Sequence, residues 1–119
     1  FLRMWALLEF LTATERMRNE DTVQRAGFIF GREPLAMTLL AHLQHQRNQY
    51  VHHDAADIDV EDFASQTKEF VDGLFSVHFG RGHRHNSLAD LALFLSLPND
   101  TAALTRQIEL RQDAIRFLS

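Results

Sequence analysis

Apolar residues recur along the chain with helical spacing, in segments separated by glycine, proline and helix-capping residues. The clearest segment lies between Val60 and His78, where the positions expected to face the core follow the i, i+3, i+4 rule of an amphipathic helix. Gly80 and Gly82 are expected to end this helix. Its core-facing positions are Val60, Phe63, Ala64, Thr67, Phe70, Val71, Leu74, Phe75 and His78.

Four further segments have helical character, so the sequence predicts an all-α bundle of about five helices. Pro34 can open one of them, because the N–H that proline lacks has no partner in a first helical turn. Ser87 is the expected N-cap of the fourth helix, and Asp100 or Thr101 that of the last. The four segments cover residues 1–18, 34–53, 88–97 and 101–118.

The same pattern predicts how two of these helices pack. Residues 1–18 are apolar nearly all the way round, which is typical of a helix at the centre of a bundle. The pattern does not decide whether residues 19–32 form a loop with a short extended piece or with a short helix. The last helix is expected to reach the core through Leu104, Ile108, Ala114, Ile115 and Leu118.

Composition restricts the class of protein. The 119 residues fit one domain, and a content of 45% hydrophobic against 24% charged residues excludes a disordered segment. The lack of Cys excludes a disulfide scaffold and a thiolate metal site, and it favours a reducing compartment, which we expect to be the cytoplasm. No apolar stretch approaches the roughly 20 residues that span a bilayer, so no membrane association is expected.

The first residue and the charge balance refine this description. The chain begins with Phe, so we expect residues 1–119 to be a single domain excised from a longer chain. A net charge of −4 argues against a general binder of long nucleic acid, whose surface is normally basic. Yet all basic residues but one are Arg, the residue suited to bidentate phosphate contacts. Local handling of one phosphate therefore fits better than a broad electrostatic track.

Polar residues gather abruptly at the end of the predicted helix 34–53. Arg47 and Asn48 stand there, followed by two consecutive histidines. His45, Asn48 and His52 are spaced three and four residues apart, so they share one face of the helix. Such a stripe is either a solvated surface or the lining of a site.

The segment Arg47-Asn48-x3-His52 resembles the R-x4–6-H motif of HEPN domains (higher eukaryotes and prokaryotes nucleotide-binding), in which Asn, Asp or His commonly follows the Arg. HEPN domains are small all-α bundles with this motif near the end of a core helix, and the run from Trp5 to Glu9 is similar to an element of their first helix. His53 also satisfies the motif spacing, and His53-Asp54 stands where members of the family often have Gly-Tyr.

The resemblance implies a metal-independent endoribonuclease that needs no cofactor and leaves 2′,3′-cyclic phosphate and 5′-hydroxyl ends on RNA. An imidazole with a pKa of about 6.5 can exchange the protons of that reaction, which suits His52, with His53 as the alternative base. Arg47 can stabilise charge on the phosphoryl oxygens, and Asn48 can orient His52 or hold a phosphate oxygen. Resembling proteins belong to phage defence and toxin systems, where a regulatory domain or an antitoxin is the expected partner.

Helix geometry bears on how such a site is assembled. Positions 47 and 52 lie about 140° apart on a regular helix, so one copy does not easily aim both side chains at one phosphate. A homodimer in which two motifs face each other removes this difficulty, and it is the arrangement that the resemblance implies. The stripe of Thr38, Ala41, His45 and Asn48 is short enough in side-chain length for two helices to approach closely.

Other polar residues are candidates for supporting roles. Glu9 is a carboxylate inside an otherwise apolar helix, where it can orient Arg47 or His52 or can simply be a paired or exposed side chain. His45 shares the stripe and is a second supporting candidate. Arg81 and Arg84 lie in a loop rich in Arg, His and Gly that can contact the RNA backbone or be solvated.

Two other readings of the same residues remain open. His53-Asp54 is the dipeptide of HD-type metal phosphohydrolases, for which His42 and His45 would be upstream ligands and Asp57 or Asp59 downstream ligands. The second alternative is a HEPN-like module without catalysis that serves in dimerisation or nucleotide binding. Cleavage that survives a chelator would separate the ribonuclease from the metal enzyme.

Overall fold

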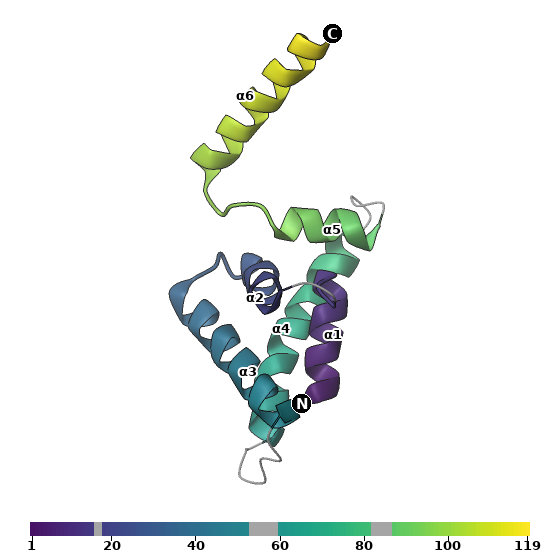
Figure 1. Cartoon of the computed structure of the whole chain (residues 1–119), viewed down its shortest axis with the longest axis vertical. Helices are drawn as coiled ribbons and strands as arrows, with labels where there is room; N and C mark the ends of the chain where they lie inside the picture. Colours follow the sequence, from purple (N-terminus) through teal and green to yellow (C-terminus); the bar gives the residue numbers. More distant parts are fainter. Residues whose placement is uncertain (16–17, 53–59, 82–86) are drawn as a thin grey trace.

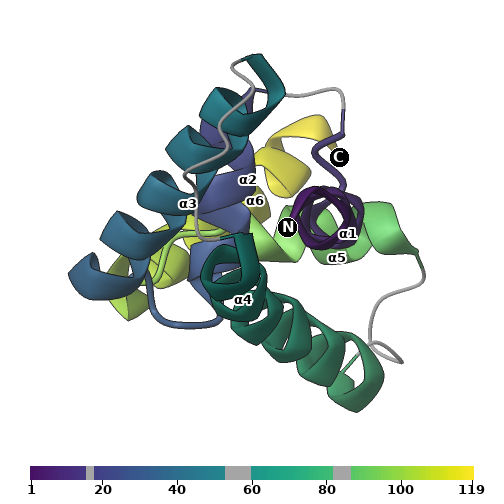
Figure 2. The same cartoon turned by 90° about the horizontal axis from the view of Figure 1, so that it is seen from below.

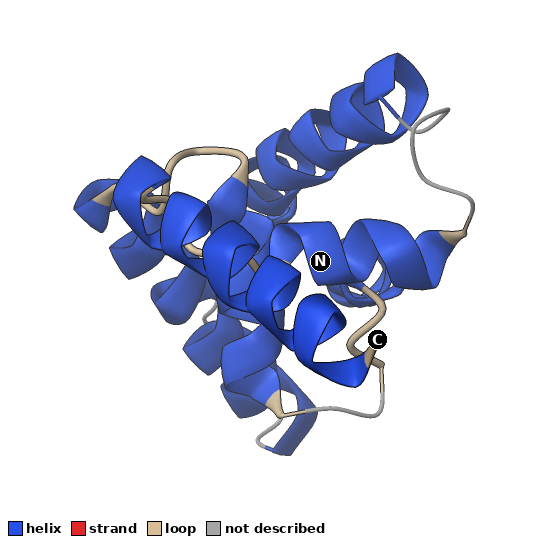
Figure 3. Cartoon of the chain, turned by 90° about the horizontal axis from the view of Figure 1, so that it is seen from above, coloured by secondary structure: helices blue, strands red, loops and turns tan. Residues whose placement is uncertain are grey.

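The computed structural model describes residues 1–15, 18–52, 60–81 and 87–119, and this part of the chain holds six α-helices and no strand (Figures 1 and 3). The predicted all-α class is confirmed. One helix more than expected is present, because residues 19–28, which the pattern left undecided, are helical. The helices are α1 (Leu2–Thr12), α2 (Asn19–Phe28), α3 (Pro34–His52), α4 (Val60–Arg81), α5 (Leu88–Leu95) and α6 (Thr101–Leu118).

The core forms where α1 lies alongside α4, with α2, α3 and α5 closing around the pair (Figures 1 and 2). Trp5 and Leu8 of α1 are almost completely buried, as expected for a core helix. Leu2 and Phe10 are exposed, so α1 buries one side and is not surrounded by the other helices as its composition predicted. The core-facing side predicted for the helix from Val60 is also confirmed at its middle, where Thr67, Phe70, Val71 and Leu74 are buried.

The first helix ends at Thr12, six residues before the predicted end at Arg18. Ala13 adopts a left-handed conformation with φ 55°, its N–H donates to Phe10 O, and the N–H of Thr14 donates to Glu9 O. This pair of bonds is a Schellman cap, which normally contains glycine at the left-handed position. The sequence pattern missed the end because alanine occupies that position here.

A chain of buried hydroxyls joins the end of α1 to α2. Thr12 Oγ1 donates to Leu8 O at 2.9 Å and lies 2.8 Å from Thr14 Oγ1, which lies 2.6 Å from Thr22 Oγ1. All three threonines are buried, so each hydroxyl depends on its neighbours for hydrogen bonds. The chain therefore fixes where α2 starts to pack beside α1.

Two glycines let α2 and the turn after it pack closely against the neighbouring helices. A β-carbon at Gly27 of α2 would collide with the Met37 side chain of α3. A β-carbon at Gly73 of α4 would approach Ile29 to 2.8 Å. The pattern of apolar residues could not reveal these contacts, because they depend on the absence of a side chain.

Two arginines anchor the connection between α5 and α6. Arg32 donates to Leu97 O and Leu95 O at 2.7 and 2.9 Å, and Arg25 donates to Ser96 Oγ at 2.8 Å. Burial lowers the pKa of Arg32, but a guanidinium remains charged at neutral pH. Asn99 Nδ2 donates to Phe28 O at 3.2 Å. These bonds hold the connection against α2.

The last helix departs from the prediction. Ser87 and Asp100 cap α5 and α6 as expected, and α5 ends at Leu95 where Leu97 was predicted. However, α6 has no buried residue and extends away from the other five helices (Figure 1). The expected core contacts of Leu104, Ile108, Ala114, Ile115 and Leu118 are therefore wrong, because the anchored connection points the helix outward. None of the described helices is long and apolar enough to cross a membrane.

Thr14→Val should lower the free energy of unfolding by about 1–3 kcal/mol, because it leaves the hydroxyls of Thr12 and Thr22 buried with fewer partners while hardly changing the side-chain volume. Chemical denaturation measures this difference. Thr105→Val on exposed α6 is the matched control and should change stability by less than about 0.5 kcal/mol. Equal effects of the two variants would contradict the role assigned to the hydroxyl chain.

Candidate functional site

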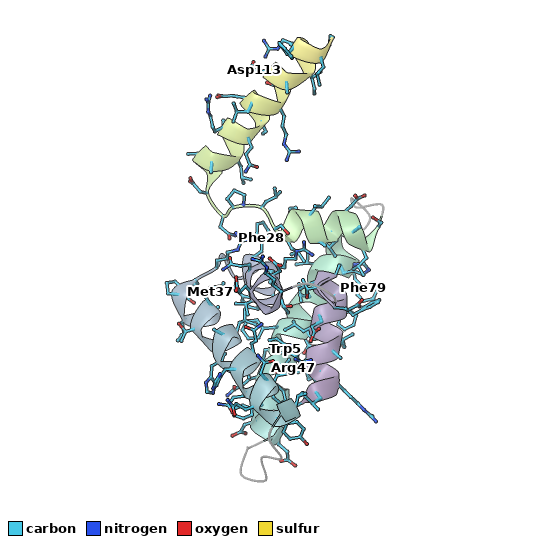
Figure 4. All side chains as sticks on the ribbon, in the orientation of Figure 1. Trp5, Phe28, Met37, Arg47, Phe79 and Asp113 are labelled. Carbon is cyan, nitrogen blue, oxygen red and sulfur yellow. The ribbon has the colours of Figure 1, made fainter. Side chains whose placement is uncertain are left out.

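Near its C-terminal end, α3 presents a cationic side chain that is fixed by two polar neighbours. Arg47 Nη1 donates to Asn48 Oδ1 at 3.1 Å, and Arg47 Nη2 lies 3.9 Å from Glu9 Oε1 of α1. The structure thus brings together three of the residues singled out from the sequence. Figure 4 shows the Arg47 side chain on the α1 side of α3, at about the level of Trp5.

The way α1 and α3 each pack against α2 and α4 explains this arrangement. Leu40 and Leu43 of α3 are fully buried, and Arg47 follows Leu43 by one helical turn. Arg47 therefore stands at the edge of the buried face rather than in open solvent. Glu9 follows Trp5 by one turn on α1, so the buried tryptophan places the carboxylate beside α3.

The ion contact between Arg47 and Glu9 contributes little to the stability of the fold. The Arg47 side chain is 31% exposed and the Glu9 side chain 18% exposed, at a separation of 3.9 Å. Ion pairs with such exposure and distance contribute about 0–1 kcal/mol. One contact is made by Nη1 and the other by Nη2 of a guanidinium that has five N–H donors, so donors remain for an anion.

The predicted polar stripe of α3 faces solvent. Thr38, Ala41 and His45 are exposed, and Asn48 is half-buried at the boundary. The helix continues without interruption to His52, so the backbone positions 47 and 52 keep the roughly 140° separation of a regular helix. The side chain of His52 lies outside the described part of the structure.

Several candidates are not joined to this cluster in the described residues. His53 and Arg84 lie outside them, as does the side chain of Arg81, whose backbone ends α4. His45 is exposed on the stripe and forms no hydrogen bond or ion pair with Arg47 in the described structure.

The described residues of the HD-type alternative do not form a metal site. The His42 ring packs edge-on against Phe63 of α4, with the ring centroids 5.8 Å apart. Among the described residues, no three His, Asp or Glu side chains lie close enough together to hold a metal ion. His53, Asp54, Asp57 and Asp59, the other members of the HD-type alternative, fall outside that part of the chain.

A buried amide beside the cluster was missed by the sequence analysis. Gln44 lies one turn before Arg47 and Asn48, and its Nε2 atom is buried without a hydrogen-bond partner in the described structure. Gln66 Oε1 of α4 is likewise buried without a hydrogen-bond partner in the described structure. The only sequence signal was a polar residue directly after Leu43 on the buried side of the helix.

Hollows on the described surface lie away from Arg47. One of about 350 Å³ is lined by Arg25 and Arg32, and one of about 310 Å³ lies between Phe28 and Val77. A third of about 190 Å³ lies beside Phe30. None of these three is lined by Glu9, Arg47 or Asn48.

Comparison of the chain with protein-family models, with curated proteins and with solved structures finds no match. The geometry of the described residues therefore carries the functional argument, together with the chemistry of their side chains.

Glu9→Gln should change the free energy of unfolding by less than about 1 kcal/mol, because the ion pair is long and partly exposed. Urea denaturation provides the test, with Glu109→Gln on α6 as a control that also removes one surface ion pair. A loss of 2 kcal/mol or more would mean that Glu9 is mainly a structural residue.

Proposed function

We propose that the chain is a metal-independent endoribonuclease of the HEPN type, with Arg47, Asn48 and His52 as its catalytic residues. The observation that carries this proposal is the fixed guanidinium of Arg47, held by Asn48 and Glu9 on a helix that continues to His52. An oriented and partly exposed arginine is suited to a single phosphate. The proposal unites this cluster with the Arg-Asn-x3-His spacing of the sequence.

The proposed reaction is a transfer within the RNA backbone. The ribose 2′-oxygen forms a bond to phosphorus, the bond from phosphorus to the 5′-oxygen breaks, and a 2′,3′-cyclic phosphate and a 5′-hydroxyl result. His52 takes the proton of the 2′-hydroxyl, and an imidazole of a second copy gives a proton to the leaving 5′-oxygen. No oxidant, reductant or co-reactant is needed.

Arg47 would stabilise the charge that builds up on the phosphoryl oxygens. A positioned donor of this kind contributes about 10²–10³-fold to a reaction rate, because it does not need to reorganise during the reaction. In this proposal Asn48, through its hydrogen bond, and Glu9, through its charge, supply the positioning of the guanidinium. Glu9 is thus a positioning residue in this proposal and does not touch the substrate.

A homodimer follows from the helix geometry within the proposal. Arg47 and position 52 point in directions about 140° apart on an unbroken helix, so two copies are needed to surround one phosphate. The exposed side chains of Thr38, Ala41 and His45 are small or short enough for two α3 helices to approach along this stripe. The partial exposure of Arg47 in one copy is compatible with a site that is completed by a second copy.

RNA cleavage by the wild-type chain should persist in EDTA, and Arg47→Ala should reduce it by at least about 100-fold. His52→Ala should have at least as large an effect, because the base is lost. Glu9→Gln should lower kcat by about tenfold with little change in KM, because it only loosens Arg47. Gel analysis of a labelled RNA, with mapping of the product ends, measures all four results.

His53→Ala is the matched control for His52→Ala and should leave cleavage nearly unchanged. Loss of cleavage in the His53 variant alone would mean that His53, and not His52, is the base. Cleavage that is unaffected by Arg47→Ala and by His52→Ala would sink the proposal. Binding of RNA without any cleavage would instead favour the HEPN-like binding module, and cleavage abolished by EDTA would favour the metal enzyme.

A further inference from the structure

The exposed helix α6 has an apolar face that is interrupted only by Arg111 and has no partner among the described residues. The positions at alternating spacings of four and three are Leu104, Ile108, Arg111, Ile115 and Leu118, which lie on one side of the helix. Ile108, Ile115 and Leu118 are 57%, 66% and 82% exposed. An apolar face of this kind on an 18-residue helix is typical of a surface that binds another protein segment.

The helix cannot cover this face by folding back onto its own chain without losing specific contacts. Its connection to α5 is held by Arg32 at Leu95 and Leu97 and by Asn99 at Phe28. Asp100 then caps the helix by accepting from the N–H groups of Ala102 and Ala103. The outward direction of α6 is therefore a property of the packed structure (Figure 1).

An apolar groove with acidic edges lies on the body of the molecule. Its floor is formed by the turn after α2, the first half of α3 and the middle of α4, where Leu35 is 73% exposed and Phe30 is 41% exposed. Glu33 and Glu69 line its edges, and neither forms an ion pair in the described structure. The groove has a volume of about 190 Å³, and its apolar lining is Phe30, Leu35, Ala36, Leu39 and Phe70.

The charges of the helix and of the groove are complementary. On the polar side of α6, Arg106 lies 3.5 Å from Glu109, and Arg116 lies 3.4 Å from Asp113. Arg111 is the exception, since it stands within the apolar face and forms no ion pair with the described residues. If this face of α6 packed against the groove, Arg111 would lie close to the carboxylates of Glu33 and Glu69, which are also unpaired in the described structure.

We propose that α6 docks into the groove beside Phe30 of a second copy of the chain, and that the exchange is reciprocal in a homodimer. Such a two-fold exchange buries both apolar faces and both grooves by one kind of contact. Arg111 of each copy meets Glu33 and Glu69 of the other. This interface uses none of the catalytic residues of the proposed ribonuclease site, and it, rather than the α3 stripe, supplies most of the affinity of the homodimer.

Direct pairing of two α6 helices is less favourable. A symmetric pair centred on the apolar face would place two Arg111 side chains close together in a region of low polarity, and like charges there are destabilising. The groove offers carboxylates at the corresponding place. The charges therefore favour the groove over a second α6 as the partner of the helix.

Sedimentation equilibrium of the whole chain at micromolar concentration should show a dimer. Ile108→Asp combined with Ile115→Asp should give a monomer that retains its helical circular dichroism, because no α6 residue is buried within one copy. Arg111→Glu should weaken the dimer by about 30-fold or more. Adding Glu33→Arg and Glu69→Arg to the same chain should restore much of the affinity, since the charges are then exchanged.

Arg116→Glu is the matched control, because it also reverses an arginine of α6 but on the polar face, and it should leave the dimer intact. A monomeric wild-type chain, or a dimer that persists in the double aspartate variant, would overturn the proposal. Loss of the dimer in Arg111→Glu without restoration by the glutamate changes would also overturn the assignment of the groove. A dimer that persists in the double aspartate variant would leave the α3 stripe as its interface, so failure of the α6 proposal is distinct from failure of the proposed activity.

Discussion

The burial of Trp5 and Leu8 of α1 against α4 is the interaction on which the rest of the structure depends. Fully burying a large apolar side chain contributes about 1.5–3 kcal/mol, and these two lie where α1 also meets α2 and α5. Their position fixes the rotation of α1 about its axis. That rotation aims Glu9 at α3, so the polar cluster around Arg47 is a consequence of core packing.

Much of the fold could be predicted because its signals are local. Ser87 and Asp100 cap helices as their side chains suggest, and the buried side of α4 follows from its periodicity. The end of α1 escaped prediction because Ala13 takes a conformation usually left to glycine. The placement of α6 escaped it for another reason: periodicity shows which face of a helix is apolar, whereas hydrogen bonds elsewhere in the chain decide what that face meets.

The candidate site also contains some contacts that the sequence predicts and others that it does not. Arg47 and Asn48 are neighbours in sequence, so their contact in the structure needed only the helix that the pattern predicted. The approach of Glu9 to Arg47 was one of two interpretations of that residue, and the contact depends on how the shared core places α1 and α3, which are far apart in the chain. The buried amide of Gln44 had no usable signal, because glutamine is equally common on solvated helix faces.

The pairing of α1 with α4 also has a consequence for the order of folding. The two helices are separated by α2, α3 and their connections, so their contact closes a long loop before its burial is gained. Local helices form within about a microsecond, whereas contacts between distant segments limit the rate. Within a single copy α6 adds nothing to the core, so we expect it to form independently of this step. The folding rate of the chain is then governed by the rate at which the contact between α1 and α4 forms.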